Sequence, residues 1–355
     1  MSSPLLFTPL TIRNLTFKNR IFMSPMCQYS AVGGVPNEWH AHHWAARAVG
    51  GVGLVIVEAS AVCPEGRITL GDTGLWNETQ KEAFERMIPF LKDMGARIGI
   101  QIAHAGRKSS RNIPWEAEGA VPLIKEGWIS SAPSEVPFGN YEIPHALTLE
   151  EIKIIIGQFR YSAKLALEAG FEVLELHFAH GYLVHEFLSP LSNQRQDQYG
   201  GSFENRSRFA LEITKAVREV WPATHPLFVR ISASDWKEGG WTLEESVKLS
   251  SLLKALSVDL IDCSSGGLVH DAKIPVGPGY QVPFARQIKS ESDILTGAVG
   301  IITNPDQAEK ILQEGAADVV LLARELLRNP YWAFSAAKAL GFELEWPVQY
   351  QRAKR

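Results

Sequence analysis

The sequence predicts an α/β fold of the (β/α)8 TIM-barrel class, because short apolar runs alternate with amphipathic stretches along the whole chain. The apolar runs are rich in β-branched residues and have the length of strands, whereas the amphipathic stretches have the length of helices. Each set has eight members, which is typical of a barrel of parallel strands surrounded by helices. The predicted strands are residues 21–26, 53–57, 98–102, 172–176, 227–231, 260–263, 294–297 and 319–322, and the predicted helices are residues 40–49, 78–94, 149–169, 203–221, 243–256, 282–290, 305–314 and 324–340.

Several predicted helices begin with a recognisable capping signal. Thr148 and Thr242 are each followed by one leucine and then a pair of glutamates, and Asn304 directly precedes Pro305. A side-chain oxygen in such a position accepts a hydrogen bond from a free amide of the first turn. A doubly wound open sheet is the alternative fold, but the glycine-rich stretch 50–53 runs into a strand instead of following the first one.

Two segments lie outside the regular alternation. Residues 7–17 alternate polar and apolar side chains, and we expect them to form a small hairpin that closes the N-terminal mouth of the barrel. Residues 105–147 follow the third strand and are far longer than ordinary connections, which have a median of roughly 4–6 residues. We expect a lid or subdomain over the catalytic face rather than a disordered insertion. Its aromatic residues can pack, and they are Trp115, Trp128, Phe138 and Tyr141.

The composition favours one large domain, residues 1–355, that acts on a small molecule. The chain is 45% hydrophobic with a formal net charge of −4, and no block of like charges indicates a nucleic-acid or anionic-membrane surface. The three cysteines, Cys27, Cys63 and Cys263, are too far apart to indicate a disulfide framework, an iron–sulfur cluster or a zinc ribbon. No apolar run reaches about 18 residues and no signal-like segment opens the chain, so we expect a soluble, cytoplasmic protein.

In a barrel of this class the catalytic groups lie at the C-terminal ends of the strands. Residues 177–182, His-Phe-Ala-His-Gly-Tyr, place two imidazoles and a phenol at one such end. Taken alone, this hexapeptide fits a metal site, an acid–base pair or core packing. The strand ends carry no lysine placed for a Schiff base, and their acids, Glu58 and Asp262, are accompanied by amides, thiols and glycines rather than by further carboxylates. This set disfavours aldolase and metal-hydrolase chemistry and suits a planar, redox-active ligand.

Five motifs follow one another along nearly the whole chain. They are Ser-Pro-Met-Cys-Gln-Tyr-Ser at 24–30, Gln-Ile-Ala-His-Ala-Gly-Arg at 101–107, His-Phe-Ala-His-Gly-Tyr-Leu at 177–183, the polar segment 190–206 and Gly-Ala-Val-Gly at 297–300. Together they resemble the old yellow enzyme family, FMN-dependent ene-reductases on a (β/α)8 barrel, and in particular its bacterial thermophilic-type or xenobiotic-reductase-like branch. The resemblance implies bound FMN, NADPH or NADH as electron donor, and reduction of small activated alkenes.

The resemblance places flavin-binding residues at several strand ends. Arg230 would lie against the flavin edge on which negative charge accumulates, and Gln101 would pair with the pyrimidine edge; the alternatives are a surface ion pair and a core amide. The loops after the seventh and eighth strands would bind the phosphate, although the family usually has glycine where Ala323 stands. The implied cofactor-binding residues are Ser24, Pro25, Met26, Cys27, Ala61, Gln101, Arg230, Gly297, Gly300, Ala323 and Arg324.

The resemblance also implies catalytic roles. His177 and His180 would bind the oxygen of an activated alkene, and Tyr182 would deliver a proton to its α-carbon. Tyr29 would reach the same oxygen, and Cys27 would contact substrate and tune the flavin rather than act as a covalent nucleophile. Zinc binding by the histidines and simple packing of the tyrosine are the alternatives; we expect no metal, because zinc needs further ligands.

The C-terminal segment 341–355 resembles a family tail in which an arginine enters the active site of a neighbouring subunit. Arg352 would be that arginine and would bind substrate, which implies a homodimer or homotetramer; a frayed basic tail is the alternative.

Two other functions stay open for the whole chain. One is a non-catalytic barrel that binds a flavin or phosphate ligand, and the other is a relative of dienoyl-CoA reductases, which carry further domains and a cysteine-held cluster.

Two conspicuous polar motifs are interpreted as structural. Residues 190–206 are dense in Asn, Arg, Asp and Gly, and we expect them to form an ordered loop and helix cap that braces the face beside the histidine pair. His40, His42 and His43 are spaced like metal ligands but open a predicted helix, so we expect them to stabilise it.

Overall fold

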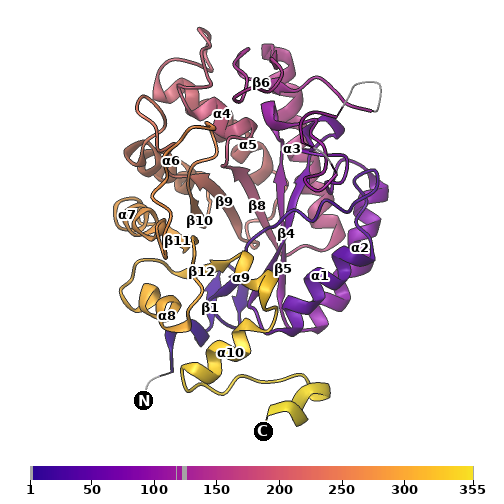
Figure 1. Cartoon of the computed structure of the whole chain (residues 1–355), viewed down its shortest axis with the longest axis vertical. Coiled ribbons are helices and arrows are strands. Elements are labelled where there is room, and N and C mark those ends of the chain that lie inside the picture. Colours follow the sequence, from indigo (N-terminus) through magenta and orange to yellow (C-terminus); the bar gives the residue numbers. More distant parts are fainter. Residues whose placement is uncertain (1–2, 117, 122–125, 355) are drawn as a thin grey trace.

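Eight parallel strands close into a barrel in the computed structural model, which describes residues 3–116, 118–121 and 126–354 (Figure 1). The strands neighbour one another in chain order, and the last pairs with the first through Val320 and Ile21. This arrangement confirms the predicted (β/α)8 fold. The barrel strands are β3 (Ile21–Met23), β4 (Leu54–Ala61), β5 (Arg97–Ala103), β8 (Val173–Phe178), β9 (Leu227–Ser232), β10 (Leu260–Ser264), β11 (Leu295–Ala298) and β12 (Val319–Leu322).

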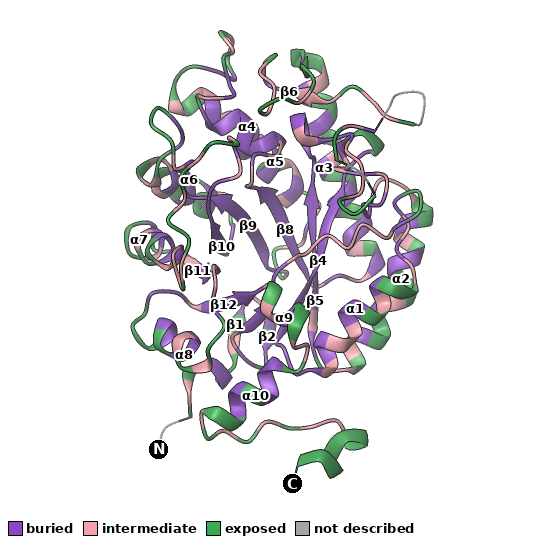
Figure 2. Cartoon of the chain, in the orientation of Figure 1, coloured by how far each residue is buried: buried purple, intermediate pink, exposed green. Residues whose placement is uncertain are grey.

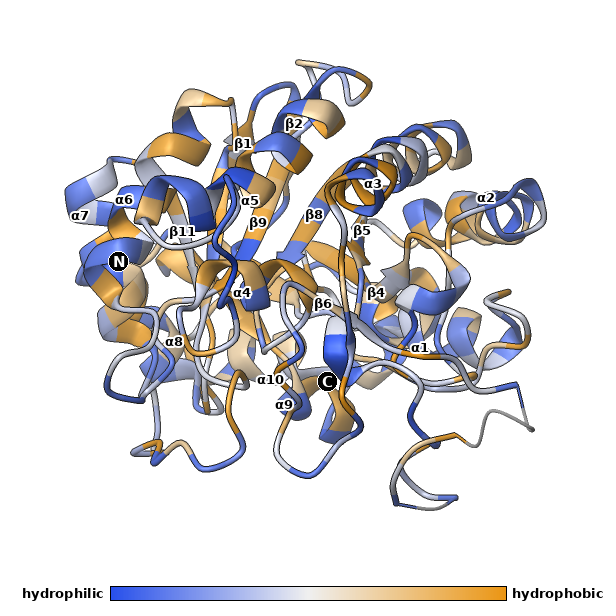
Figure 3. Ribbon diagram, turned by 90° about the horizontal axis from the view of Figure 1, so that it is seen from above, coloured by the Kyte–Doolittle hydropathy of each residue, from blue (hydrophilic) through white to orange (hydrophobic). Residues whose placement is uncertain are grey.

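The helices surround the barrel, with hydrophilic residues concentrated on them and on the loops while the strands are mainly hydrophobic (Figure 3). The predicted caps are confirmed, because Thr148 and Thr242 each form a capping box and the side chain of Asn304 accepts a hydrogen bond from the Asp306 amide. The helices are α1 (Glu38–Val49), α2 (Glu78–Asp93), α3 (Leu149–Ala169), α4 (Leu183–Leu188), α5 (Phe203–Arg218), α6 (Leu243–Ala255), α7 (Val282–Ser292), α8 (Pro305–Gln313), α9 (Arg324–Arg328) and α10 (Trp332–Ala339).

The single helix predicted for residues 324–340 is wrong, because the chain breaks it into α9 and α10. Pro330 lies at the break, and it has no amide hydrogen for a helical bond and favours an extended residue before it. Asn329 adopts this extended conformation, with φ −136° and ψ 92°. The break lets the Pro330 carbonyl approach the end of α1, where a Cβ on Gly50 would lie 1.9 Å from its oxygen.

The N-terminal mouth of the barrel is plugged by the predicted hairpin. Strands β1 (Leu10–Ile12) and β2 (Leu15–Phe17) pair antiparallel, and their apolar side chains join a buried cluster with the inward-facing residues of the barrel strands. That cluster includes Phe22, Leu54 and Phe228. The strands are buried along their length, whereas exposed residues lie on the surrounding helices (Figure 2). Water is therefore excluded from the N-terminal half of the barrel interior.

The excursion after β5 is tied to the catalytic face by two arginines. Arg107, within the short helix η3 (Gly106–Lys108), donates to the carbonyls of Val136 and Leu268. Arg195 of the polar segment donates to the carbonyls of Pro133 and Leu147, at distances of 2.9 and 2.5 Å. The helix cap predicted within residues 190–206 is confirmed, because the Ser202 side chain accepts a hydrogen bond from the Asn205 amide at the start of α5. Residues 117 and 122–125 of the predicted lid lie outside the described residues, and strands β6 (Ser131–Ala132) and β7 (His145–Ala146) pair within it.

His40 of α1 stabilises the start of the helix and its contact with the barrel. The Asn37 amide donates to His40 Nδ1 at 3.1 Å, and His40 Nε2 lies 3.3 Å from Glu58 Oε1. Trp44 Nε1 donates to the other oxygen of Glu58 at 3.0 Å. The register of β4 shifts after Val57, which accompanies the contact of Glu58 with α1. This acid therefore serves helix packing, as the structural interpretation of His40 requires.

Metal and membrane sites were also sought over the described ranges. Within them, no group of three or more His, Cys, Asp or Glu side chains is arranged to hold a metal ion. Among the helices of the same ranges, none combines the length and apolar character needed to cross a bilayer.

Removing a ring from the plug should destabilise the whole barrel. Phe17 is 0% exposed and its ring centroid lies 4.8 Å from that of Phe22, so Phe17→Ala leaves a cavity. We expect the free energy of unfolding, measured by urea denaturation, to fall by about 3–5 kcal/mol. The matched control is Phe90→Ala in α2, where the ring is 54% exposed. Equal effects of the two substitutions would contradict the plug.

Candidate active site

The C-terminal parts of β8, β9 and β10 bring two predicted site residues, His177 and Arg230, next to Asp262. His177 on β8 pairs in register with Arg230 on β9, which in turn pairs with Asp262 on β10. Side chains alternate along a strand, so each of these strands presents an inward series that begins apolar and ends polar. On β9 the series is Phe228 in the plug, then Arg230, then Ser232.

The two histidines and the tyrosine form one cluster. The ring centroid of His177 lies 5.1 Å from that of His180 and 5.1 Å from that of Tyr182, both in edge-to-face geometry. Burial, followed by the charge of Arg230, lowers the pKa of both histidines well below the ordinary value. Both imidazoles are therefore neutral at neutral pH, so each ring carries one N–H donor. Nδ1 of His177 is buried without a hydrogen-bond partner within the described residues.

Lys108 is a site residue that the sequence reasoning missed. Its ammonium donates to the carbonyls of His180 and Gly267, at 2.8 and 2.7 Å, and lies 5.3 Å from the ring centroid of Tyr182. Burial lowers the pKa of Lys108 to about 8. The signal was available, because this lysine directly follows the Gln-Ile-Ala-His-Ala-Gly-Arg motif at the end of a predicted strand.

The loop after β3 supplies Cys27 and Tyr29. Burial, then the charges of Asp72 and Glu58, raise the pKa of the Cys27 thiol well above its ordinary value. A protonated thiol is a poor nucleophile, which agrees with a contact role for this cysteine. Tyr29 has a φ of +48° and stacks edge-on against Trp115 with centroids 6.1 Å apart. Trp115 thus brings the lid over this loop.

A layer of charged side chains crosses the barrel between the N-terminal plug and the histidines. Its members are Glu175, Arg230 and Asp262. Arg230 is 7% exposed, and its Nε lies 3.1 Å from Asp262 Oδ2. Gln101 Nε2 donates to Glu175 Oε1 at 2.8 Å. The surface ion pair considered for Arg230 is thereby excluded. The prediction that Asp262 has no carboxylate companion is wrong, because Glu175, hidden in the middle of an apolar strand, is a second one.

The carboxyl groups of this layer are hard to ionise. Burial, then the charge of Asp262, raise the pKa of Glu175 to about 8, although Arg230 and Gln101 oppose the shift. Burial also raises the pKa of Asp262, against the opposing charge of Arg230. Because like charges in one dry site disfavour each other, the pair retains a proton and balances the single guanidinium.

A cavity of about 340 Å³ lies at the ends of β9 to β12, beside this layer. The predicted residues Arg230, Gly300, Ala323 and Arg324 line it, together with Ser264. Three arginines line the cavity, Arg230, Arg324 and Arg328, and their positive charge makes it suitable for an anionic ligand.

Three other residues predicted to bind the cofactor, Gly297, Ala61 and Ser24, lie in structural surroundings of different kinds. Gly297 lies within β11, where a Cβ would come 2.3 Å from Leu321, so barrel packing requires glycine there. The Ala61 amide already donates to the Thr73 carbonyl at 2.9 Å. Ser24 is buried, and its hydroxyl has no partner within the described residues.

Arg352 is not brought to the histidine cluster of its own chain. It lies on the exposed helix η5 (Val348–Lys354), which follows α10 at the opposite end of the molecule from α4 (Figure 1). Tyr350 of this segment contacts Tyr331, with the hydroxyl oxygens 3.4 Å apart. The role of Arg352 in a neighbouring subunit stays a prediction.

These features fit FMN. The Ser24 hydroxyl and His177 Nδ1, which have no partner within the described residues, lie at the strand ends. The edge of an isoalloxazine can bind both a cation and an amide, and Arg230 and Gln101 are buried groups of these two kinds. Arg324 and the loop at Gly300 would hold its phosphate, since both line the cavity next to Arg230.

Comparisons with known proteins agree with the site. Residues 5–343 match the family model described as the NADH:flavin oxidoreductase / NADH oxidase family. An NADPH dehydrogenase of Geobacillus sp. (strain WCH70) is 52% identical over 354 residues, which cover 99% of each chain. Morphinone reductase in complex with tetrahydroNAD superposes with a TM-score of 0.80 at 26% identity, over 97% of this chain and 93% of that one. An old yellow enzyme homologue from Zymomonas mobilis gives a TM-score of 0.79 at 25% identity, over 97% and 95% of the two chains.

These matches favour an enzyme over a barrel that only binds a ligand. They span nearly the full length of the NADPH dehydrogenase and of the two solved structures. The chain therefore belongs to the NADH:flavin oxidoreductase / NADH oxidase family, which is that of the old yellow enzymes, and is an NAD(P)H-dependent oxidoreductase with FMN as its cofactor.

Proposed function

We propose that the protein is an ene-reductase that reduces the C=C bond of small α,β-unsaturated carbonyl or nitro compounds. The observation that carries the proposal is the pair of neutral imidazoles, His177 and His180, beside the phenol of Tyr182 at the barrel mouth. Bound FMN supplies a hydride from its N5 atom. What the side chains must add is polarisation of the alkene and a proton.

The histidines provide the polarisation. Two neutral N–H donors directed at one carbonyl or nitro oxygen stabilise the negative charge that grows there as the β-carbon accepts the hydride. Ser264 Oγ lies 2.7 Å from His180 Nε2, which fixes that ring and leaves Nδ1 for another partner. Tyr29, on the facing loop, would complete the oxygen site.

Tyr182 provides the proton. Burial, followed by the charges of Cys27 and Tyr29, raises the pKa of its phenol well above the ordinary value, so the group is protonated at neutral pH. Lys108, 5.3 Å from the ring centroid, would stabilise the phenolate that remains after transfer to the α-carbon.

The charged layer of Arg230, Glu175 and Asp262 would set the electrostatics of the bound cofactor. Arg230 would lie by the flavin edge that gains negative charge on reduction. Because the Glu175–Asp262 pair keeps one proton, it carries a single negative charge and does not outweigh the positive charge of Arg230. Gln101 is oriented by its bond to Glu175, so its carbonyl oxygen is free to accept from the pyrimidine edge.

We propose that the nicotinamide donor and the alkene use the same site in turn. Morphinone reductase, which has a similar fold, has been solved in complex with tetrahydroNAD. We further propose a cytoplasmic homodimer or homotetramer in which Arg352 of one subunit binds substrate in another. The exposed position of the tail, with Tyr350 41% exposed, is compatible with such a contact.

Tyr182→Phe should separate the two half-reactions. Stopped-flow absorbance of the FMN bands should show reduction by NADPH at a rate within about twofold of wild type, and reoxidation by 2-cyclohexenone slowed by about 100-fold or more, because general acid catalysis contributes on this scale. Tyr199→Phe is the matched control, since its hydroxyl bonds Glu212 away from the cluster. Failure of wild-type reduced enzyme to be reoxidised by any alkene without oxygen would refute the ene-reductase proposal.

The double substitution His177→Ala with His180→Ala tests the oxygen site. Phenols bound against oxidised flavin give a long-wavelength absorbance, and the variant should lose this band while FMN stays bound. Loss of two charge-assisted hydrogen bonds predicts an affinity decrease of at least about 100-fold. An unchanged phenol dissociation constant would show that the histidines do not bind the oxygen.

Glu175→Gln should change the pH dependence of stability. The folded-state pKa near 8 exceeds the ordinary value of 4.5, so between these values the unfolded chain loses a proton that the folded chain keeps. Wild-type stability should therefore fall with rising pH in this window, by up to about 1.4 kcal/mol per pH unit. Urea denaturation with equal excess FMN should show the variant gaining on wild type from pH 5 to 8. Parallel pH profiles would mean that Glu175 ionises normally.

A further inference from the structure

The turn that carries His180 and Tyr182 has an unfavourable backbone conformation. His180 has a φ of +61° and Gly181 a φ of +70°, so two consecutive residues adopt the left-handed region that side chains disfavour. The turn also packs tightly, because a Cβ on Gly181 would lie 2.2 Å from the Gly267 carbonyl oxygen. Other groups must therefore hold it in place.

Two backbone amides of the turn are held by buried side chains. The His180 amide donates to Ser232 Oγ at 2.9 Å, and that hydroxyl donates in turn to the Gly266 carbonyl at 2.8 Å. The Gly181 amide donates to His185 Nδ1 at 2.9 Å. His185 belongs to α4, four residues further along, so this bond folds the turn back onto the helix that follows it.

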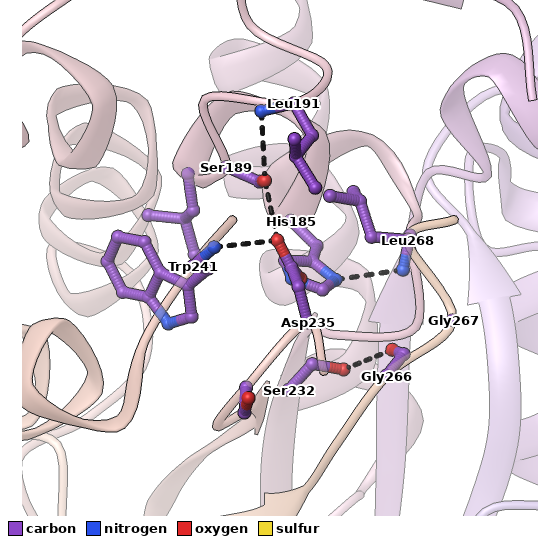
Figure 4. Close-up of polar contacts among 12 residues, drawn as sticks. His185, Ser189, Leu191, Ser232, Asp235, Trp241, Gly266, Gly267 and Leu268 are labelled. Atoms are coloured by element: carbon purple, nitrogen blue, oxygen red, sulfur yellow. Dashed lines mark hydrogen bonds and ion pairs between the residues drawn. The ribbon is translucent and has the colours of Figure 1, made fainter. Parts of the chain in front are cut away.

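His185 is in turn fixed by Asp235, and both side chains are 0% exposed (Figure 4). His185 Nε2 lies 2.9 Å from Asp235 Oδ1. Because Nδ1 accepts the Gly181 amide, the ring hydrogen must reside on Nε2, the nitrogen that contacts Asp235. The two contacts hold the imidazole in a single tautomer with a single orientation.

Asp235 is held on its other oxygen as well. Oδ2 accepts from Ser189 Oγ at 2.6 Å and from the Trp241 amide at 2.7 Å (Figure 4). Burial alone would raise the pKa of Asp235, but the contacts from His185, Ser189 and Trp241 outweigh it and leave the pKa lowered. An ionised carboxylate thus anchors the imidazole from the loop that follows β9.

The grouping of Ser189, Asp235 and His185 has the composition of a hydrolytic triad but not its connectivity. The serine hydroxyl donates to the aspartate, and the histidine nitrogen that would activate a nucleophile is occupied by the Gly181 amide. The group therefore has a mechanical rather than a nucleophilic role.

We propose that His185 and Asp235 are positioning residues for the substrate-oxygen site, acting through the Gly181 amide on the orientation of His180 and Tyr182. The inference rests on the proposed function of that site. It assigns the fine geometry of the oxygen clamp to a buried imidazole–carboxylate pair that touches neither substrate nor FMN.

Two isosteric substitutions in the FMN-loaded enzyme separate positioning from general stability. In His185→Asn, the amide oxygen can take the place of Nδ1 and accept the Gly181 amide, whereas in His185→Gln the polar group reaches toward Asp235 and the Nδ1 position is lost. We expect the dissociation constant of 4-chlorophenol, measured by its charge-transfer absorbance, to rise at least tenfold in His185→Gln and less than threefold in His185→Asn. KM for 2-cyclohexenone should follow the same order, with thermal stability lowered in both.

Ser250→Ala supplies the control, because its buried hydroxyl bonds the Ser246 carbonyl within α6, away from the site. Equal phenol affinity in both His185 variants, or losses that follow only their thermal stability, would overturn the inference. If His185→Gln does not retain FMN, Asp235→Asn takes its place, with an increase of at least fivefold in the phenol dissociation constant expected and an unchanged constant overturning the proposal. Wild-type enzyme that binds no phenol and is not reoxidised by the enone would instead refute the proposed function itself.

Discussion

A permanent cation buried in the barrel, Arg230, is the constraint on which the rest of the site depends. A guanidinium removed from water must be neutralised nearby, and here Asp262 and Glu175 do so within the same layer. Two ionised carboxylates would leave excess negative charge, so the pair keeps a proton. The plug formed by the hairpin and Phe228 keeps water away from below, which makes this balance necessary and durable.

The same layer accounts for the chemistry at the mouth. His177 is next to Arg230 across the sheet, so burial and the nearby cation hold its imidazole neutral, as a donor rather than a charged acid. Neutral donors and a protonated Tyr182 suit a reaction in which negative charge develops on substrate and then accepts a proton. The electrostatics of binding a flavin and of activating an alkene thus come from one arrangement of strands.

Regular features of the barrel were predictable from the sequence because they depend on local chemistry. Thr148 and Thr242 cap helices by short-range bonds, and the apolar runs are long enough to identify strands. Glu175 was missed because it lies inside such a run, where only the three-dimensional register reveals Gln101 as its partner. The helix over 324–340 was wrong because its apolar periodicity continued through Pro330, and the proline decided the local backbone. His177, His180 and Tyr182 were found through their motif. Ser264 at the end of β10 and Lys108 in η3, which contact His180, come from other parts of the chain and were not found.

Stability and function are divided along the axis of each strand, and this division explains why the positioning groups are so deeply buried. The plug uses the first inward residue of β8 to β10, the charged layer the second and the site the third. The left-handed turn at His180 departs from this regular frame and cannot be held by strand pairing. The backbone amides of this turn therefore need side-chain acceptors, which are Ser232 and His185. A buried acceptor can hold such an amide in place only if its own orientation is fixed. Asp235 meets that requirement for His185, so the geometry of the oxygen clamp depends on a residue that lies 55 positions after His180 in the chain.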